Sequence, residues 1–175
     1  EELSALDAGY WWTRDDGATY PARGTGVHIP SLEELLEALP DDARLNVDIK
    51  SRDEGAADQV ADLLLEHDAA HRSCVGSFDA AVAAELRARL PDSCAYYPEA
   101  TARWQILGDL LPLESGTSPR YHILEIPTSS AGISLATEGL VRRAHRRDQL
   151  VWYWTINDSD EMEEVLATGA DGLIT

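Results

Sequence analysis

Basic residues are scarce in this sequence. Lysine and arginine number 14 against 32 aspartates and glutamates, and Lys50 is the only lysine. The formal charge of −18 at pH 7 would repel the phosphate backbone of nucleic acid and any anionic lipid surface. We therefore expect an acidic protein that binds no nucleic acid and does not insert into a membrane.

Cysteines and long apolar runs are equally rare. Cys74 and Cys94 are too few for a disulfide framework, and neither stands in a CxxC or a Cys/His metal spacing, so we interpret both as buried apolar residues. No stretch approaches the roughly 20 apolar residues of a membrane helix, and no basic-then-apolar leader opens the chain. The chain begins at Glu1 instead of Met, so the sequence leaves open whether a leader or a longer segment precedes it. The expected location is the cytoplasm.

From Pro40 onward the sequence alternates short apolar runs, rich in β-branched and aromatic residues, with longer stretches of helical period. This alternation is typical of βα units around a parallel sheet. Six runs are predicted as strands: Leu45–Lys50, Ser73–Ser77, Cys94–Tyr97, Tyr121–Ile126, Leu150–Ile156 and Asp171–Thr175.

Helix start and stop signals fall between and before these runs. Ser31 with Glu34 three residues later is a capping box, which opens a helix with one leucine-rich face. Gly169 supplies a left-handed stop before the last run. Further N-caps are expected at Asp79, Thr137 and Asp158.

Two stretches do not follow the alternation. Residues Glu1–Ile29 hold tryptophan and tyrosine amid Gly, Asp and Arg without a sustained period, so we interpret them as a loop or an insertion. The stretch between the third and fourth runs is expected to hold a helix around Ala102–Leu111 and then a surface loop at Glu114–Arg120.

The architecture is left open by the periodicity alone. The length of 175 residues fits one domain, but six βα units are two short of a closed eight-stranded barrel, for which roughly 250 residues are typical. An open parallel sheet of flavodoxin type accepts the same pattern. In a barrel lacking two strands, the six strands form one parallel sheet in chain order, and the first and last of them do not pair with each other.

Reactive groups of parallel α/β proteins lie at the C-terminal ends of the strands. Asp48 and Lys50 close the first run as VDIK and point to the same side of that strand. The pair is either a simple ion pair or a site in which a compact ammonium and a carboxylate hold a phosphate oxygen beside a divalent metal. The other runs end with Ser77, Phe78, Glu125, Trp154, Asn157 and Thr175.

Several segments together resemble a known family. They are LSALDAGYWW, GTGVHIPSLEELLEALP, LNVDIK, the pair Ser77 and Phe78, YWTIND and GADGLIT. Their order and spacing are similar to the C-terminal two thirds of a glycerophosphodiester phosphodiesterase. The resemblance implies a TIM-type (β/α) barrel with about six of eight strands present, in a single domain over residues 1–175 that lacks the N-terminal strands.

The resemblance also implies an activity and a site. Members of that family hydrolyse glycerophosphodiesters to glycerol 3-phosphate and an alcohol, a step of lipid metabolism that uses a divalent metal and two histidines. By position, Asp48 matches a metal-binding carboxylate that is usually Glu, Lys50 the lysine near the phosphate, and Trp154 the tryptophan that lines the pocket. Glu125 is expected as a further pocket residue, Mg²⁺ or Ca²⁺ as the metal, and a small glycerophosphodiester as the partner.

The family's histidines have no counterpart in these residues. Its HRG histidine, its Glu-x-Asp pair and its HD histidine all precede the segment matched here by EELSALDAGYWW. We interpret His71 and His145 as solvated helix residues, and no partner spacing surrounds His28, His67 or His122.

We therefore expect hydrolysis from the full-length parent and none from residues 1–175 alone, because the proton donor and part of the metal site are missing. Two alternatives stay open. One is a degenerate barrel that binds a phosphate-containing ligand without catalysis, and the other is a related phospholipase-type phosphodiesterase.

Overall fold

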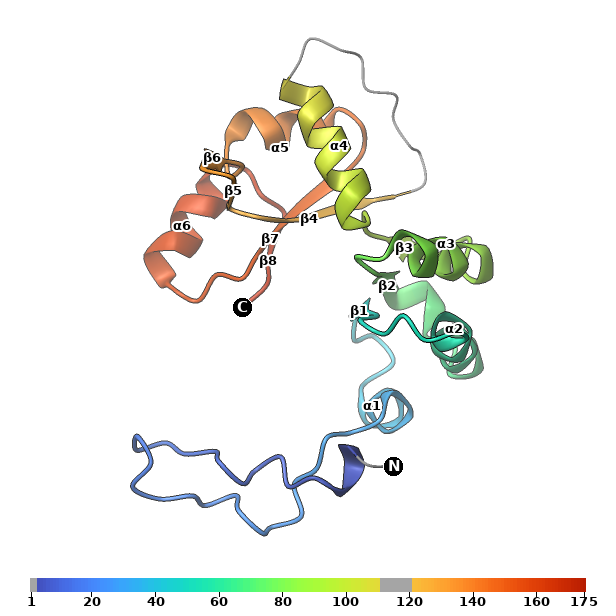
Figure 1. Ribbon diagram of the computed structural model, residues 1–175, viewed down its shortest axis with the longest axis vertical. Helices are drawn as coiled ribbons and strands as arrows, with labels where there is room; N and C mark the ends of the chain where they lie inside the picture. Colours follow the sequence, from blue (N-terminus) through green and yellow to red (C-terminus); the bar gives the residue numbers. More distant parts are fainter. Residues whose placement is uncertain (1–2, 111–120) are drawn as a thin grey trace. The chain divides into compact units, whose positions relative to one another are not determined.

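The computed structural model describes residues 3–110 and 121–175. The chain divides into two compact units, Glu1–Ala43 and Arg44–Thr175. Figure 1 labels the α-helices and strands of both units. The first unit contains the 3₁₀ helix η1 (Leu3–Ala5) and the helix α1 (Leu32–Ala38), and the second contains all the strands.

A long loop between η1 and α1 makes up most of the first unit. The backbone N–H of Ala8 donates to the Val27 carbonyl at 2.9 Å, which brings the two ends of the loop together. The Arg23 guanidinium lies 4.3 Å from the ring centroid of Tyr10 and donates to the Tyr10 carbonyl at 2.9 Å. In this stretch the described residues form turns and bends, in keeping with the loop that the sequence predicts for Glu1–Ile29.

The capping box predicted at Ser31 is confirmed. The Ser31 hydroxyl accepts from the backbone N–H of Glu34 at 3.1 Å, and the Glu34 carboxylate accepts from the backbone N–H of Ser31 at 2.8 Å. These two bonds satisfy N–H groups that the first turn of a helix leaves without an intrahelical partner.

Two three-stranded parallel sheets form the frame of the second unit, in the orders β1-β2-β3 and β4-β7-β8. A parallel bridge from Tyr96 to Ile123 joins the two sheets. The strand order follows the chain, so the flavodoxin-type alternative is wrong. Each predicted run contains one strand: β1 Leu45–Asp48, β2 Ser73–Gly76, β3 Cys94–Ala95, β4 Ile123–Pro127, β7 Leu150–Trp154 and β8 Gly172–Leu173.

The described strands do not close into a barrel. Among the residues that the structure describes, no backbone pairing joins β1 to β8, so these two strands are the edges of the array. This agrees with the expectation for a barrel in which the first and last strands present do not meet.

The prediction that residues 45–175 contain only parallel pairing is wrong at one place. After β4 the chain forms an antiparallel hairpin of β5 (Ser129–Ser130) and β6 (Ile133–Ser134). Its two turn residues, Ala131 and Gly132, have φ angles of 50° and 78°. Positive φ at both central residues is the conformation that joins adjacent antiparallel strands with a two-residue loop.

Helices separate the strands as predicted. Asp79, Thr137 and Asp158 each accept hydrogen bonds from backbone N–H groups of the first helical turn, which confirms all three N-caps, and Gly169 has the expected positive φ of 90°. The helices are α2 Ala56–Glu66, η2 Ala70–Arg72, α3 Ala80–Arg89, α4 Glu99–Leu110, α5 Glu138–His145 and α6 Ser159–Ala167.

Some helix ends differ from the prediction or cannot be compared with it. The sequence predicts a helix from Thr137 through Arg147, whereas α5 ends two residues earlier, at His145. The predicted helix end at Leu111 and the predicted loop at Glu114–Arg120 lie outside the described residues. In the described part of the chain, no helix has the length and apolar character needed to cross a membrane.

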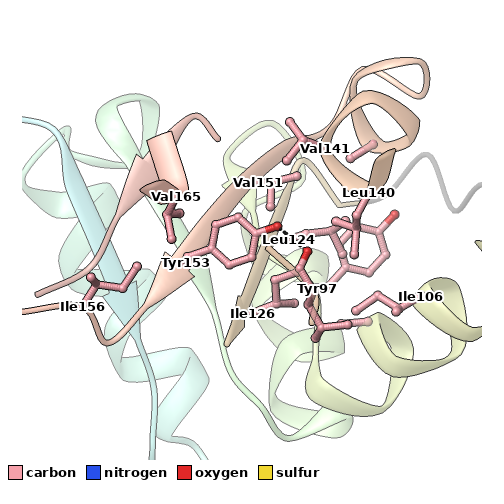
Figure 2. Packing of buried hydrophobic residues seen from close by; sticks show 13 residues of the cluster. Tyr97, Ile106, Leu124, Ile126, Leu140, Val141, Val151, Tyr153, Ile156 and Val165 are labelled. Carbon is pink, nitrogen blue, oxygen red and sulfur yellow. Dashed lines mark hydrogen bonds between the residues drawn. The ribbon is translucent and has the colours of Figure 1, made fainter. Parts of the chain in front are cut away.

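The hydrophobic core of the second unit lies between the β4–β7 sheet and its helices (Figure 2). Leu124 and Ile126 of β4, with Val151 and Tyr153 of β7, point to the helix-covered side and are at most 3% exposed. The Tyr153 hydroxyl donates to the Leu135 carbonyl at 2.7 Å, which satisfies its polar end. Burying each of these side chains stabilises the fold by about 1.5–3 kcal/mol.

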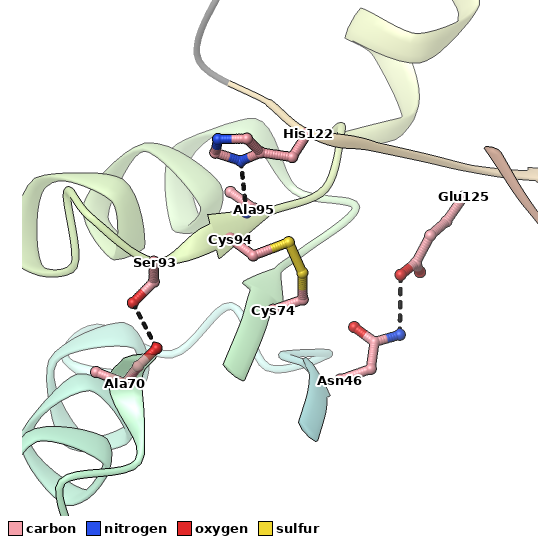
Figure 3. Close-up of a disulfide and its surroundings, with 8 residues drawn as sticks. All are labelled: Asn46, Ala70, Cys74, Ser93, Cys94, Ala95, His122 and Glu125. Carbon is pink, nitrogen blue, oxygen red and sulfur yellow. Dashed lines mark hydrogen bonds between the residues drawn. A yellow bond between two sulfur atoms is a disulfide. The ribbon is translucent and has the colours of Figure 1, made fainter. Parts of the chain in front are cut away.

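Cys74 and Cys94 form a disulfide, so their interpretation as buried apolar residues is wrong (Figure 3). The two cysteines are register partners on the neighbouring strands β2 and β3, with Cα atoms 4.3 Å apart, and both side chains are only partly buried. The sequence does not reveal this pairing, because it depends on the register between two strands 20 residues apart.

Reduction of this disulfide is expected to destabilise the protein by about 3 kcal/mol, since a bridge across some 20 residues restricts the unfolded chain. The measurement is urea denaturation of the full-length protein with and without dithiothreitol. The double variant Cys74→Ser/Cys94→Ser serves as control and should not respond to the reductant at this site. Equal unfolding free energies for oxidised and reduced wild type would contradict the prediction.

Candidate functional site

The face of the strands opposite the helix-covered core carries most of the predicted site. In a parallel pair, register partners point to the same side of the sheet. Asp48 is paired with Gly76, and Glu125 is paired with Trp152, two residues before Trp154. Asp48, Glu125 and Trp154 therefore lie on this second face, which we call the inner face.

Glycines make room for aromatic rings on the inner face. A Cβ atom at Gly76 would lie 2.6 Å from the ring of Tyr96, and a Cβ atom at Gly172 would lie 2.8 Å from the ring of Trp152. Real Cβ atoms do not approach other atoms so closely, so both positions require glycine unless the rings move. The two rings thus pack directly over the backbone of the neighbouring strand.

A chain of contacts runs along the C-terminal ends of the strands. Asp48 and Lys50 form an ion pair through Oδ2 and Nζ. The same ammonium lies 4.2 Å from the ring centroid of Phe78, and the Phe78 ring lies 5.9 Å from that of Trp154. The structure therefore brings Asp48, Lys50 and Trp154 together. It also adds Phe78, for which the sequence predicts no role in the site.

The Lys50 ammonium remains open to solvent. Its side chain is 68% exposed, whereas that of Asp48 is 25% exposed. An exposed ion pair of this kind contributes little to stability. Asp48 and the Phe78 ring hold the Lys50 ammonium in place, and the ammonium remains accessible to a ligand at this end of the strands.

Glu125 is the buried acid of the inner face. It is 7% exposed, and its Oε1 accepts a hydrogen bond of 2.8 Å from Nδ2 of Asn46 (Figure 3). Burial raises the pKa of Glu125, and the nearby Asp48 carboxylate raises it further, while the hydrogen bond from Asn46 and the charge of Lys50 act in the opposite direction. The four residues share one electrostatic environment, and Asn46 fixes the position of the Glu125 carboxylate.

Several buried polar atoms around this site lack a hydrogen-bond partner among the described residues. They are Oδ1 of Asp48, the hydroxyl of Tyr96 and Nε1 of Trp154. Burial, and then the polar contact of the hydroxyl with the Asp48 carboxylate, raises the pKa of Tyr96, so its hydroxyl stays protonated at neutral pH. Unpaired buried polar groups are rare in folded proteins, and a group of them on one face is the arrangement that a bound polar ligand satisfies.

A cavity of about 380 Å³ adjoins the contact chain, the name we give to the contacts that link Asp48, Lys50, Phe78 and Trp154. Phe78, Glu125 and Trp154 form the wall that it shares with the site. The opposite walls come from α4 and from the β5–β6 hairpin. The volume is in the range of small-molecule binding pockets, and the C-terminal ends of parallel strands are where such pockets form.

The part of the chain that the structure describes does not complete a metal site. It contains no group of three His, Cys, Asp or Glu side chains placed to hold an ion. Asp48 and Glu125 could supply two oxygen ligands, and Oδ1 of Asp48 is free to do so.

His71, His122 and His145 of the second unit are paired with residues outside the contact chain. His71 pairs with Asp68 at 3.7 Å and is 66% exposed. His145 lies 2.8 Å from Oδ2 of Asp171, an oxygen that also accepts from the backbone N–H of Val151. Nδ1 of His122 accepts from the backbone of Ala95, and His28 lies 3.4 Å from Glu34.

Replacement of Glu125 by glutamine is expected to stabilise the protein at neutral pH. A carboxyl group whose folded-state pKa is raised contributes stability below its unfolded pKa and loses it as the pH rises through the folded-state pKa. At pH 8 the ionised Glu125 is therefore a cost that Glu125→Gln removes, with a gain of about 1 kcal/mol.

Urea denaturation of the full-length protein at pH 5 and pH 8, with EDTA present, measures this effect. Glu163→Gln, at an exposed position in the middle of α6, is the matched control and should change little. A Glu125→Gln variant that is less stable than wild type at pH 8 would show that the carboxylate stabilises the fold.

Comparisons with known proteins identify the family and the fold. The model of the glycerophosphoryl diester phosphodiesterase family matches residues 1–175. A Mycobacterium tuberculosis protein named "Probable glycerophosphodiester phosphodiesterase 2" is 28% identical over 173 residues, which is 87% of this chain and 58% of that protein. The chain thus spans less than two thirds of the length of this curated relative.

Solved structures show the fold. One is the glycerophosphoryl diester phosphodiesterase domain of an uncharacterised Mycobacterium tuberculosis protein, with a TM-score of 0.82, 20% identity and coverage of 99% of this chain and 70% of that one. Another is a glycerophosphodiester phosphodiesterase from Parabacteroides distasonis, with a TM-score of 0.64, 19% identity and coverage of 99% and 65%. The chain has their α/β fold of TIM-barrel type, and it belongs to the glycerophosphoryl diester phosphodiesterase family.

Proposed function

We propose that the full-length protein hydrolyses glycerophosphodiesters to glycerol 3-phosphate and an alcohol. The observation that carries the proposal is the contact chain Asp48–Lys50–Phe78–Trp154 beside a cavity at the C-terminal ends of the strands. It offers a carboxylate with a free oxygen, an exposed ammonium and an aromatic wall, which suit a metal, a phosphate and a glycerol respectively.

The reaction consumes one water. Its oxygen bonds to phosphorus, the bond from phosphorus to the alcohol oxygen breaks, and one proton of the water ends on the departing alkoxide. The charge on the phosphate oxygens grows in the transition state, so a fixed cation such as Lys50 favours the transition state over the bound diester.

Asp48 is proposed as a ligand of a divalent metal, Mg²⁺ or Ca²⁺, with Lys50, Trp154 and Glu125 as substrate-binding residues. The orphaned Oδ1 of Asp48 and the nearby carboxylate of Glu125 fit hard cations that prefer oxygen ligands. Such a metal, when bound, supplies Lewis acidity at a phosphate oxygen. The residues of this chain hold the phosphate and exclude water from the aromatic side of the pocket.

The unpaired edges of β1 and β8 support a complete barrel of eight strands in one domain, of which this chain contributes six. Unpaired strand edges attract other strands, and natural proteins cover or close them. The proton donor for the leaving alcohol would come from outside residues 1–175, because His71 and His145 pair with Asp68 and Asp171, outside the contact chain. Residues 1–175 alone are therefore expected to be inactive.

The cellular location is a separate part of the proposal. The sequence favours the cytoplasm, but the Cys74–Cys94 disulfide favours an oxidising compartment, where such bonds persist. Thiol titration of the protein isolated from its own cells distinguishes the two: blocked thiols at Cys74 and Cys94 would argue against the cytoplasm.

The competing function is a degenerate barrel that binds a phosphate-containing ligand without hydrolysis. The test is ³¹P NMR of glycerophosphocholine incubated with the full-length protein and Mg²⁺ or Ca²⁺. We expect conversion of the diester signal to that of glycerol 3-phosphate, and loss of conversion with EDTA. An unchanged diester signal with either metal, at a protein concentration that binds the diester, would favour the degenerate barrel.

A further inference from the structure

We propose that the cavity beside the contact chain binds an apolar chain, so that the preferred ligand of this site is a phosphodiester carrying one alkyl or acyl chain. The inference rests on the proposed function for the position of the phosphate. It goes further by naming the substrate class, since a glycerophosphodiester such as glycerophosphocholine carries no such chain.

The walls of the cavity away from the site are mainly apolar. Ala102 and Ile106 of α4 and Leu135 after the hairpin are at most 8% exposed and form its inner part. Leu107 of α4 and Ile133 of β6 also line it, and these two are 48% and 50% exposed. Half-exposed apolar side chains that line a concave space gain most when an apolar group covers them.

The β5–β6 hairpin holds one of these walls in place. Its two-residue turn at Ala131 and Gly132 sets the register in which Ser130 faces Ile133. The backbone N–H groups of Leu135 and Ala136 both donate to the Thr128 carbonyl, at 2.8 and 3.1 Å, and close the base of the hairpin. The apolar wall is therefore part of the fold rather than a surface that forms only around a ligand.

The cavity shares three residues with the candidate phosphate site. Phe78 contacts the Lys50 ammonium on one side and lines the cavity on the other, and Trp154 and Glu125 also belong to both. A single ligand that fills both spaces must carry a phosphate at Lys50 and an apolar group between α4 and the hairpin. The ligand is thus an amphiphile with its polar and apolar parts directly joined.

The charge of the protein favours a single-chain monomer over a membrane surface. The chain carries a formal charge of −18, which repels anionic bilayers, whereas a single-chain amphiphile dissolves in water as a monomer. The charged rim of the cavity fits a ligand that enters from water, because Glu99 and Arg103 lie there as an exposed pair at 3.4 Å.

The probes for the test are butyl phosphate and octyl phosphate, which carry the same head group and differ by four methylenes. Calorimetric titration of the full-length protein measures both dissociation constants below the micelle concentration. Each buried methylene strengthens binding about threefold to fourfold, so octyl phosphate is expected to bind at least tenfold more tightly.

Two variants place a charge in opposite walls of the cavity, Ile133→Glu and Leu107→Glu. Both are expected to lower the affinity for octyl phosphate far more than that for butyl phosphate, and so to abolish the preference for the longer chain. Leu166→Glu, on the exposed face of α6 and outside the cavity, is the matched control and should retain the preference. Thermal unfolding establishes that each variant is folded.

Equal affinities for the two probes, absence of binding by both, or a preference that survives both cavity variants would each overturn the inference. Hydrolysis of glycerophosphocholine and of lysophosphatidylcholine, a diester with one acyl chain, is measured in parallel. Turnover without a chain preference contradicts only the inference, and a chain preference without turnover of any diester contradicts the proposed function and leaves the inference about the ligand standing.

Discussion

Replacement of Lys50 by alanine is expected to lower kcat/KM of the full-length protein for glycerophosphocholine by about 10²- to 10³-fold. Lys50 is the only lysine in these 175 residues, and its ammonium is exposed beside Asp48 and Phe78. Removing a fixed cation from the place where phosphate charge develops costs transition-state binding more than ground-state binding. The loss should therefore be mainly in kcat.

Arg52→Ala is the matched control for Lys50→Ala. Arg52 is a neighbouring cation, 80% exposed, whose Nε pairs with Asp79 at 3.2 Å, outside the contact chain. Its removal should change kcat/KM less than about twofold, as expected for an exposed ion pair. Equal losses of activity in both alanine variants would mean that any nearby positive charge has the same effect. The proposed contact of Lys50 with the phosphate would then be wrong.

Replacement of Asp48 by alanine is expected to lower activity by about 10³-fold or more and to raise the metal concentration needed for half-maximal activity. Asp48 combines a free buried oxygen with an ion pair to Lys50, so its loss affects the metal and the cation together. The measurement is the initial rate over a titration of Mg²⁺ or Ca²⁺.

Asp48→Glu gives this prediction a second arm. The family resemblance implies that the metal-binding carboxylate at this position is usually Glu. The Asp48→Glu variant is therefore expected to keep partial or full activity. Asp58→Ala, an exposed carboxylate that pairs with Arg89 at 2.6 Å, is the control. An Asp48→Ala variant with an unchanged metal requirement would remove Asp48 from the metal site.

The strands and helix caps were predictable because their signals are local. The six apolar runs, the capping box at Ser31 and the N-caps at Asp79, Thr137 and Asp158 each depend on residues within one or two turns. The pairing of Asp48 with Lys50 was predictable for the same reason, since residues two apart on a strand point to the same side of that strand.

The parts that were missed depend on pairs far apart in the chain. The hydrogen bond from Asn46 to Glu125 spans 79 residues, and the Cys74–Cys94 disulfide depends on strand register. Asn46 could have been suggested by the period of two, since it precedes Asp48 by two positions on the same strand. The role of Phe78 required the fold, because Phe78 follows β2 and Trp154 ends β7, and only the folded chain brings their rings within 5.9 Å.

The central claim is that Asp48 and Lys50 act together in one phosphodiesterase site. A double-mutant cycle tests it, with kcat/KM for glycerophosphocholine measured for the full-length wild type, Asp48→Ala, Lys50→Ala and the double variant. If the two residues hold the same metal-bound phosphate, the double variant should lose about as much activity as the worse single variant. Losses that multiply, or a wild type without turnover, would contradict the account.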